Sequence, residues 1–171
     1  MAVEQCDEGV YASNLVAGAE YDYHYPSRHL FAPPLLPWFI EWSQVAFGVT
    51  DFASIVVNLV MGSLTVLLAG LVGRAWFGDR AGIAAAALAA LAGMHILYSR
   101  TALTDPLLCL WMLAAVYAYW AALGQGDFRW AAVAGLLTGL AWWTKYNGWL
   151  PLAIALSAAV PWLIFSGGRR R

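Results

Sequence analysis

Five ionisable residues in this sequence have side chains suited to handling a phosphate ester. Asp7 and Glu8 are adjacent near the start of the chain, Arg100 and Asp105 lie close together, and Lys145 follows later. Arginine and lysine hold phosphate oxygens, and a carboxylate can take the proton of an attacking hydroxyl. Phosphate leaves as a stable anion, so one base suffices, in contrast to the paired carboxylates of glycoside hydrolysis. These residue types therefore suit a phosphate-bearing substrate attacked by a hydroxyl, if the fold gathers them.

The elements that must position these residues are apolar helices. The chain is 62% hydrophobic and only 11% charged, whereas a soluble domain carries about 25% charged residues. A bilayer core of about 30 Å needs about 20 apolar residues in a helix. Segments such as 81–93 are apolar on all sides, which does not fit a soluble helical core with polar faces. Five stretches contain no charged residue, and the fourth is the shortest: 52–73, 81–99, 106–126, 130–144 and 146–168.

The basic residues sort between alternate connections of these stretches. Six of them lie in connections that would share one side: Arg74, Arg80, Arg129, Arg169, Arg170 and Arg171. The positive-inside rule assigns that side to the cytoplasm. We therefore expect five crossings, the N-terminus outside, and Asp7, Arg100, Asp105 and Lys145 together at the outer face, where a phosphate-bearing lipid would be met.

Residues 1–51 are expected to form an external segment, because they are polar, rich in aromatics and hold no crossing-length apolar run. Within them, 35–47 is predicted to be a short helix lying on the bilayer, since Trp38, Trp42 and Val45 share one helical face. Asp79 is expected to cap the second crossing helix.

Each candidate residue also has a plainer interpretation. Asp105 precedes a proline, as at a helix start where Asp caps and Pro takes the first position. Asp7 and Glu8 fit a solvated helix start, and Arg100 and Lys145 fit interfacial anchors that extend their charges to water.

Histidines give no strong metal motif. His24 and His29, with Glu20 and Asp22, offer ligands, but their spacing matches no known site. His95 is interpreted as a packed or interfacial histidine. We therefore predict no required cofactor and no metal ligand set, and leave dependence on a divalent metal open.

Four motifs then occur in a fixed order along the chain. They are Asp7-Glu8-Gly9-Val10-Tyr11-Ala12, Pro33-Pro34-Leu35-Leu36-Pro37-Trp38, Tyr98-Ser99-Arg100 leading to Asp105, and Gly139-Leu140-Ala141-Trp142-Trp143-Thr144-Lys145. Together they resemble the signatures of C-type, lipid-donor glycosyltransferases, the group of the protein O-mannosyltransferases and lipid A aminoarabinose transferases. The resemblance implies inverting transfer of a sugar from a polyprenyl-phosphate carrier to a hydroxyl acceptor.

By this resemblance, Asp7 lies at the catalytic centre as the base, with Glu8 beside it. Asp105 is the second-loop acid that orients donor or acceptor. Arg100 and Lys145 fall near the donor phosphate. Apart from the resemblance, Tyr11, like Tyr21, Tyr23 and Tyr25, offers a ring that either stacks on a sugar or lies at the level of the lipid headgroups.

The family's lysine before the double proline is Ala32 here. That phosphate contact is therefore expected either to be lost or to be supplied by Arg28 or His29.

The sequence thus predicts an all-α polytopic membrane protein in the plasma membrane, with its active face outside. We take 1–171 as part of a glycosyltransferase module, with 1–51 external and 52–168 crossing the membrane, and expect it to be an N-terminal fragment. The expected partners are a polyprenyl-phosphate sugar lipid, membrane lipids and an unidentified lipid, glycan or protein acceptor, without nucleic acid. The rivals are a non-catalytic membrane subunit, a lipid-binding scaffold and a transporter fragment, although transporters place ionisable residues near the midplane.

Overall fold

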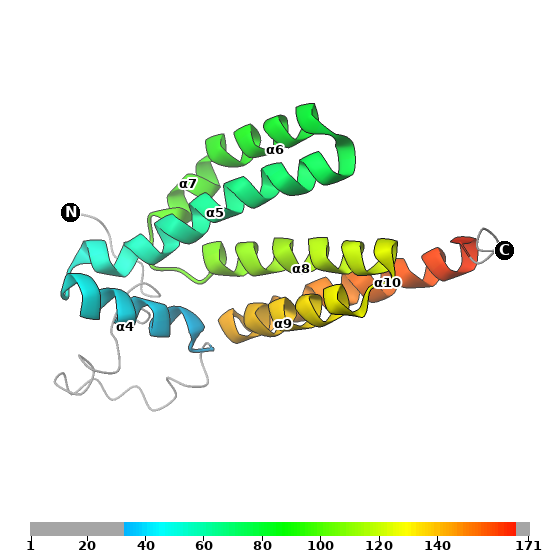
Figure 1. The fold of residues 1–171 in the computed structure, drawn as a ribbon. Coiled ribbons are helices and arrows are strands. Elements are labelled where there is room, and N and C mark those ends of the chain that lie inside the picture. The colour runs from blue at the N-terminus through cyan, green and yellow to red at the C-terminus, as the bar shows by residue number, and fades with distance from the viewer. Residues whose placement is uncertain (1–32, 167–171) are drawn as a thin grey trace.

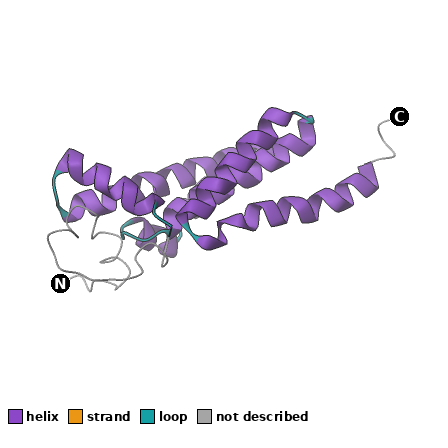
Figure 2. Cartoon of the chain, turned by 90° about the horizontal axis from the view of Figure 1, so that it is seen from below, coloured by secondary structure: helices purple, strands orange, loops and turns teal. Residues whose placement is uncertain are grey.

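The structure of the protein, a computed structural model, describes residues 33–166 (Figure 1). These residues form helices joined by short loops, without a strand among them (Figure 2). The elements are α4 (Leu35–Phe47), α5 (Asp51–Phe77), α6 (Asp79–Leu91), α7 (Gly93–Ser99), α8 (Asp105–Gln125), α9 (Phe128–Thr144), the 3-10 turn η1 (Tyr146–Trp149) and α10 (Leu150–Ser166). The predicted all-α membrane class is confirmed.

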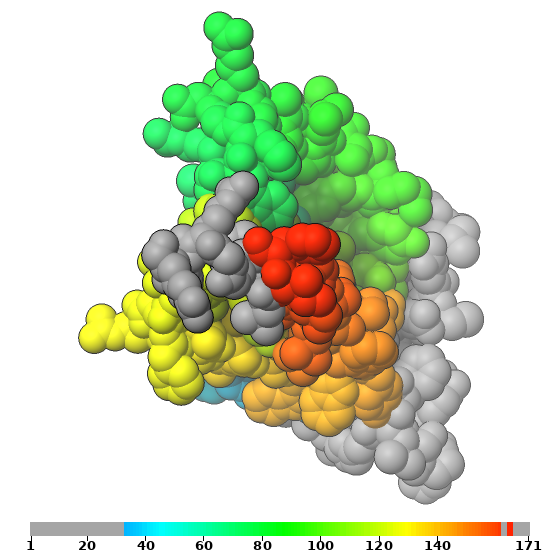
Figure 3. Space-filling view, turned by 90° about the vertical axis from the view of Figure 1, so that its right-hand side faces the viewer, coloured from blue at the N-terminus to red at the C-terminus, as the bar shows by residue number. Residues whose placement is uncertain are grey.

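The long helices run back and forth, so their ends gather at two ends of the bundle (Figure 1). One end, called here the Asp105 end, gathers the start of α5, the end of α7, the start of α8 and the end of α9. The opposite Arg74 end holds the α5–α6 turn and the α8–α9 turn, and Figure 3 looks onto it. Arg74, Arg80 and Arg129 thus lie at the end opposite Asp105, as the sorting of charges predicts.

Two helices, α5 and α8, are long and apolar enough to cross a membrane, with 27 and 21 residues. A third crossing results if α6 and α7 are one broken span, bent by 61°. The two other expected crossings are α9 and α10 of 17 residues each, about 26 Å long at 1.5 Å per residue. Length and composition therefore support two or three of the five expected crossings.

The break between α6 and α7 was not anticipated from the charge-free run that contains it. It lies at Ala92, whose backbone is extended with φ −67° and ψ 114°. Below the break, α5 and α6 pack closely through small residues: a Cβ on Gly82 would lie 2.7 Å from the Gly70 carbonyl oxygen. Small residues allow such close approach of helices in membranes.

The expected cap at Asp79 is wrong. The N-cap of α6 is Gly78, whose φ of 91° makes the turn, and no side chain caps the helix. Asp79 is already helical, and its Oδ1 instead lies 2.7 Å from Nε of Arg74.

Aromatic residues tie the helices together at the Arg74 end. Trp76 of α5 lies edge-on to Trp120 of α8, with ring centroids 6.0 Å apart. Tyr117 of α8 meets Trp130 of α9 at 6.0 Å. Tryptophan and tyrosine concentrate at the boundaries of membranes, so this cluster is typical of a helix end at a bilayer surface.

At the other end, α4 covers the loop between α7 and α8. Its Leu36 and Ile40 are fully buried against Leu103 and Leu107. The opposite face exposes the three residues predicted to share it, Trp38, Trp42 and Val45. The predicted bounds of this helix are confirmed, and its position on the bilayer remains a prediction.

Candidate active site

Asp105 and Lys145 form an ion pair between the start of α8 and the end of α9. Nζ of Lys145 donates to Oδ1 of Asp105 at 2.9 Å, and the two side chains are 41% and 40% exposed. A pair this open contributes little to stability, about 0 to 1 kcal/mol. Its main consequence is therefore geometric, because it holds a carboxylate and an ammonium group together at a helix end.

The helix-cap interpretation of Asp105 is wrong. The N-cap of α8 is Thr104, with φ −71° and ψ −16°, and no side chain makes a capping bond there. Asp105 is the first helical residue and Pro106 the second. The carboxylate of Asp105 is thus free of capping and faces Lys145.

The turn after α9 fixes Lys145 through its backbone. The Lys145 N–H donates to the Ala141 carbonyl at 3.0 Å, and its own carbonyl accepts from Gly148 at 2.8 Å. Gly148 packs directly on the backbone of Ala141 and Trp142, where a Cβ would clash. Only glycine fits this close approach, so Gly148 keeps the turn that carries Lys145 packed against the end of α9.

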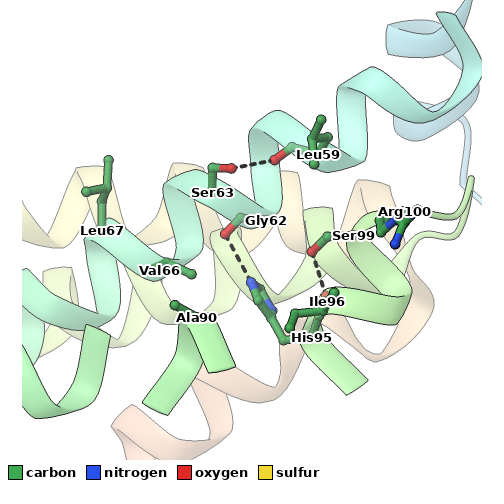
Figure 4. Close-up of a pocket in the computed structure, with 10 residues that line it drawn as sticks. All are labelled: Leu59, Gly62, Ser63, Val66, Leu67, Ala90, His95, Ile96, Ser99 and Arg100. Carbon is green, nitrogen blue, oxygen red and sulfur yellow. Dashed lines mark hydrogen bonds between the residues drawn. The ribbon is translucent and has the colours of Figure 1, made fainter. Parts of the chain in front are cut away.

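Arg100 lies at the other side of the same loop, as the C-cap of α7. Its side chain is exposed and takes part in no ion pair with residues 33–166. It stands at one end of an apolar groove of about 460 Å³ between α5 and α7 (Figure 4). The groove is lined by Leu59, Gly62, Ser63, Val66, Leu67, Ala90, His95, Ile96, Ser99 and Arg100.

His95 is a packed histidine, as predicted. Its Nε2 lies 3.1 Å from the carbonyl oxygen of Gly62 in α5 (Figure 4). A carbonyl only accepts, so Nε2 carries the hydrogen in this contact. The residue therefore joins α7 to α5 in the wall of the groove.

Asn58 is a residue that the sequence interpretation missed. It is fully buried in α5, and its Nδ2 donates to the carbonyls of Thr101 and Leu103, both at 2.6 Å. The available signal was an asparagine inside a charge-free apolar stretch. Buried polar groups in such stretches usually have a partner, but the sequence does not show which.

Four predicted site residues, Asp7, Glu8, Tyr11 and His29, lie outside the described residues. The expected approach of Asp7 and Asp105 therefore stays a prediction. The structure brings together Asp105 and Lys145, and a short loop connects Asp105 to Arg100.

Residues 33–166 contain no group of three or more His, Cys, Asp or Glu side chains able to hold a metal ion. The alternative metal set, His24 and His29 with Glu20 and Asp22, is outside the described range.

Comparison of the chain with known proteins finds one family model and several similar proteins, and their descriptions agree. A family model described as dolichyl-phosphate-mannose-protein mannosyltransferase matches residues 32–171. An undecaprenyl phosphate-alpha-4-amino-4-deoxy-L-arabinose arabinosyl transferase 2 of Sodalis glossinidius is 32% identical over 80% of this chain and 26% of its own length.

Two further relatives carry the corresponding arabinosyl transferase name. The one from Pseudomonas aeruginosa UCBPP-PA14 is 29% identical over 88% of this chain and 28% of its own length. The one from Erwinia tasmaniensis is 30% identical over 96% of this chain and 31% of its own length. The chain thus spans between a quarter and a third of these relatives, and no solved structure matches it.

Proposed function

This chain belongs to the dolichyl-phosphate-mannose-protein mannosyltransferase family, and from that premise we propose that it forms part of a lipid-donor glycosyltransferase. The enzyme would move a sugar from a polyprenyl-phosphate carrier to a hydroxyl acceptor. The relatives named as undecaprenyl phosphate arabinosyl transferases support this donor class.

The observation that carries the proposal is the position of Arg100. It offers an exposed guanidinium at the end of an apolar groove, which is the complement of a lipid with an anionic head. From Leu59 to Leu67 the groove follows α5 for about 12 Å. An isoprenoid chain would lie along this wall, with its phosphate at Arg100.

A short loop joins Arg100 to the carboxylate–ammonium pair. Arg100 and Asp105 are five residues apart, so their Cα atoms are at most about 18 Å apart. Lys145, bound to Asp105 at 2.9 Å, adds a second cation beside the carboxylate. Two cations and one carboxylate at the same end of the bundle suit a sugar phosphate whose leaving group becomes more negative during transfer.

The proposed reaction is a single displacement at the anomeric carbon of the sugar. The acceptor oxygen forms the new bond, the bond to the phosphate oxygen breaks, and the polyprenyl phosphate leaves with that electron pair. Attack opposite the leaving group inverts the anomeric centre. The hydroxyl proton goes to a carboxylate, for which we propose Asp7, with Glu8 beside it and Asp105 orienting donor or acceptor.

We place this site outside the cell, at the outer face of the plasma membrane. The support is the charge distribution, because Arg74, Arg80 and Arg129 lie at the opposite end of the helices and basic residues favour the cytoplasmic side. The acceptor is proposed as a lipid, glycan or protein hydroxyl at that face.

The test is a transfer assay on membranes that contain the full-length protein, with undecaprenyl-phosphate-linked aminoarabinose as the first donor probe and mannosyl lipid as the second. Sugar incorporation with release of polyprenyl phosphate is expected. Asp7→Asn keeps the size of the side chain but removes its basicity, so kcat should fall by about 10² to 10⁴ while donor binding is retained. Donor binding without transfer, or an Asp7→Asn variant with normal turnover, would contradict the proposal and favour a lipid-binding scaffold.

A further inference from the structure

The side chain of Asn58 connects a membrane helix to the loop between Arg100 and Asp105. Asn58 belongs to α5, and both hydrogens of its amide nitrogen are used by carbonyls 43 and 45 residues further along the chain. Both bonds measure 2.6 Å. A single buried side chain therefore holds the loop at two points.

The loop is enclosed from both sides. Asn58 binds the Thr101 and Leu103 carbonyls from α5, while Ala102 and Leu103 pack in the core formed with α4. Arg100 lies directly before the held segment, and Asp105 follows it after one residue. Movement of the segment would therefore move at least one of these two side chains.

The contact needs a donor atom that carries two hydrogens, as an amide nitrogen does. Donation to two carbonyls at once requires two N–H groups on one atom, which aspartate and leucine lack. The Oδ1 atom of Asn58 is buried without a hydrogen-bond partner among the described residues. An unpaired buried oxygen is costly, so the residue is a poor choice for packing alone and is explained by the two bonds that it donates.

We propose that Asn58 is a positioning residue of the transferase site: it holds the loop at Thr101 and Leu103 and so fixes Asp105 against Lys145. This inference rests on the proposed function for its catalytic consequence. Arg100 keeps its own backbone bond to the Leu97 carbonyl of α7, at 3.1 Å, so release of the loop should affect Asp105 more than Arg100.

The first experiment measures the loop itself, in the full-length protein without Cys6 and Cys109. Ala102→Cys places a thiol in the buried loop, and Ala53→Cys places a control thiol at a fully buried position of α5. With Asn58→Leu, a maleimide should modify Cys at 102 at least about tenfold faster than in the parent, while Cys at 53 stays protected. Thr65→Val is the matched control, because the Thr65 hydroxyl donates to Met61 of its own helix; it should leave both rates unchanged.

The second experiment measures transfer with the same variants. Asn58→Leu should lower kcat by about tenfold to a hundredfold, as expected for misplaced reacting groups, with the donor KM within threefold of the parent. Thr65→Val should keep both constants. A residue needed only for folding would reduce the amount of active enzyme and expose Cys at 53, without a loop-specific change.

The outcomes separate the two claims. If Cys at 102 stays protected in Asn58→Leu, the positioning role is overturned, whatever the transfer assay shows. If Asn58→Leu fails to fold, Asn58→Ala, which leaves room for water at the two carbonyls, replaces it; exposure of both thiols there would also overturn the inference. If the loop is released in Asn58→Leu but the parent protein itself transfers no sugar, the proposed function and the catalytic part of the inference are contradicted, while the role of Asn58 in holding the loop stands.

Discussion

The two ends of the helix bundle each carry one carboxylate bound to one cation, and the two pairs differ in how they are made. Arg74 and Asp79 meet across a single turn at 2.7 Å, with side chains 68% and 77% exposed. Asp105 and Lys145 meet at 2.9 Å from two different helices, and both side chains are more than half covered. The shorter contact is thus the one that local geometry produces on its own, and a short distance alone does not mark a functional pair.

The surroundings separate the pairs further. At the Asp105 end, Gly148 packs directly on the backbone of Ala141 and Trp142. The same end contains the loop held by Asn58 and the apolar groove that ends at Arg100. The groove beside Arg74 and Asp79 lies over the small residues where α5 and α6 cross. Both ends thus have an apolar groove beside a cation, and the Asp105 end differs in the loop held by Asn58 and the close packing of Gly148, which supports placing the chemistry there.

The largest expected difference between the two ends is their side of the membrane. In a background without Cys6 and Cys109, an impermeant thiol reagent added to intact cells should label cysteine at positions 100 and 145. It should leave cysteine at positions 74 and 129 unlabelled until the membrane is opened. Labelling of position 129 from outside would contradict the proposed orientation.

Matched carboxylate substitutions should separate the two ends by about a hundredfold in turnover. Asp105→Asn removes the charge that Lys145 holds and should lower kcat by about 10², the scale of a misplaced reacting group. Asp79→Asn makes the same change at the Arg74 end and should stay within twofold. Steady-state transfer assays measure both, and equal effects would remove the distinction.

Matched changes of cations should separate the ends by about tenfold in donor affinity. Arg100→Ala and Lys145→Ala each remove one contact proposed for the phosphate, so KM for the donor should rise about tenfold, about 1.4 kcal/mol. Arg74→Ala should leave KM unchanged. A binding measurement with the polyprenyl phosphate alone serves as the check, and unchanged affinity in all three variants would exclude the phosphate role.

The smallest expected difference between the two ends is in stability, at the turn glycines Gly148 and Gly78. Gly148→Ala introduces a Cβ into the backbone of Ala141 and Trp142, and overpacking of this kind costs about 1 to 3 kcal/mol. Gly78→Ala meets open space but must keep a φ of 91°, a cost of about 1 kcal/mol. Thermal unfolding in detergent should show the larger fall in melting temperature for Gly148→Ala, and turnover should fall in that variant alone. The reverse order of melting temperatures would show that the contact between η1 and α9 is loose.

The sequence was most informative where local composition decides the structure. The apolar runs predicted α5 and α8 closely, and the prolines and aromatic spacing predicted α4 with its exposed Trp38 and Trp42. It was less informative at helix starts. Asp79 and Asp105 both have the residue type of a cap, yet neither caps, because the backbone makes the turn one residue earlier in each case.

What the sequence by itself determined is the membrane class, the family and, among residues 33–166, which ionisable residues belong to each end. Apolar run length, motif order and charge sorting are properties of the chain itself. The tertiary structure alone decided that Asp105 pairs with Lys145, that the second apolar run breaks at Ala92, and that Asn58 bonds to the loop between Arg100 and Asp105. Contacts between residues that lie 40 or more positions apart in the sequence depend on how the helices pack. No local pattern encodes that packing, because the same apolar helix surface is compatible with many neighbours.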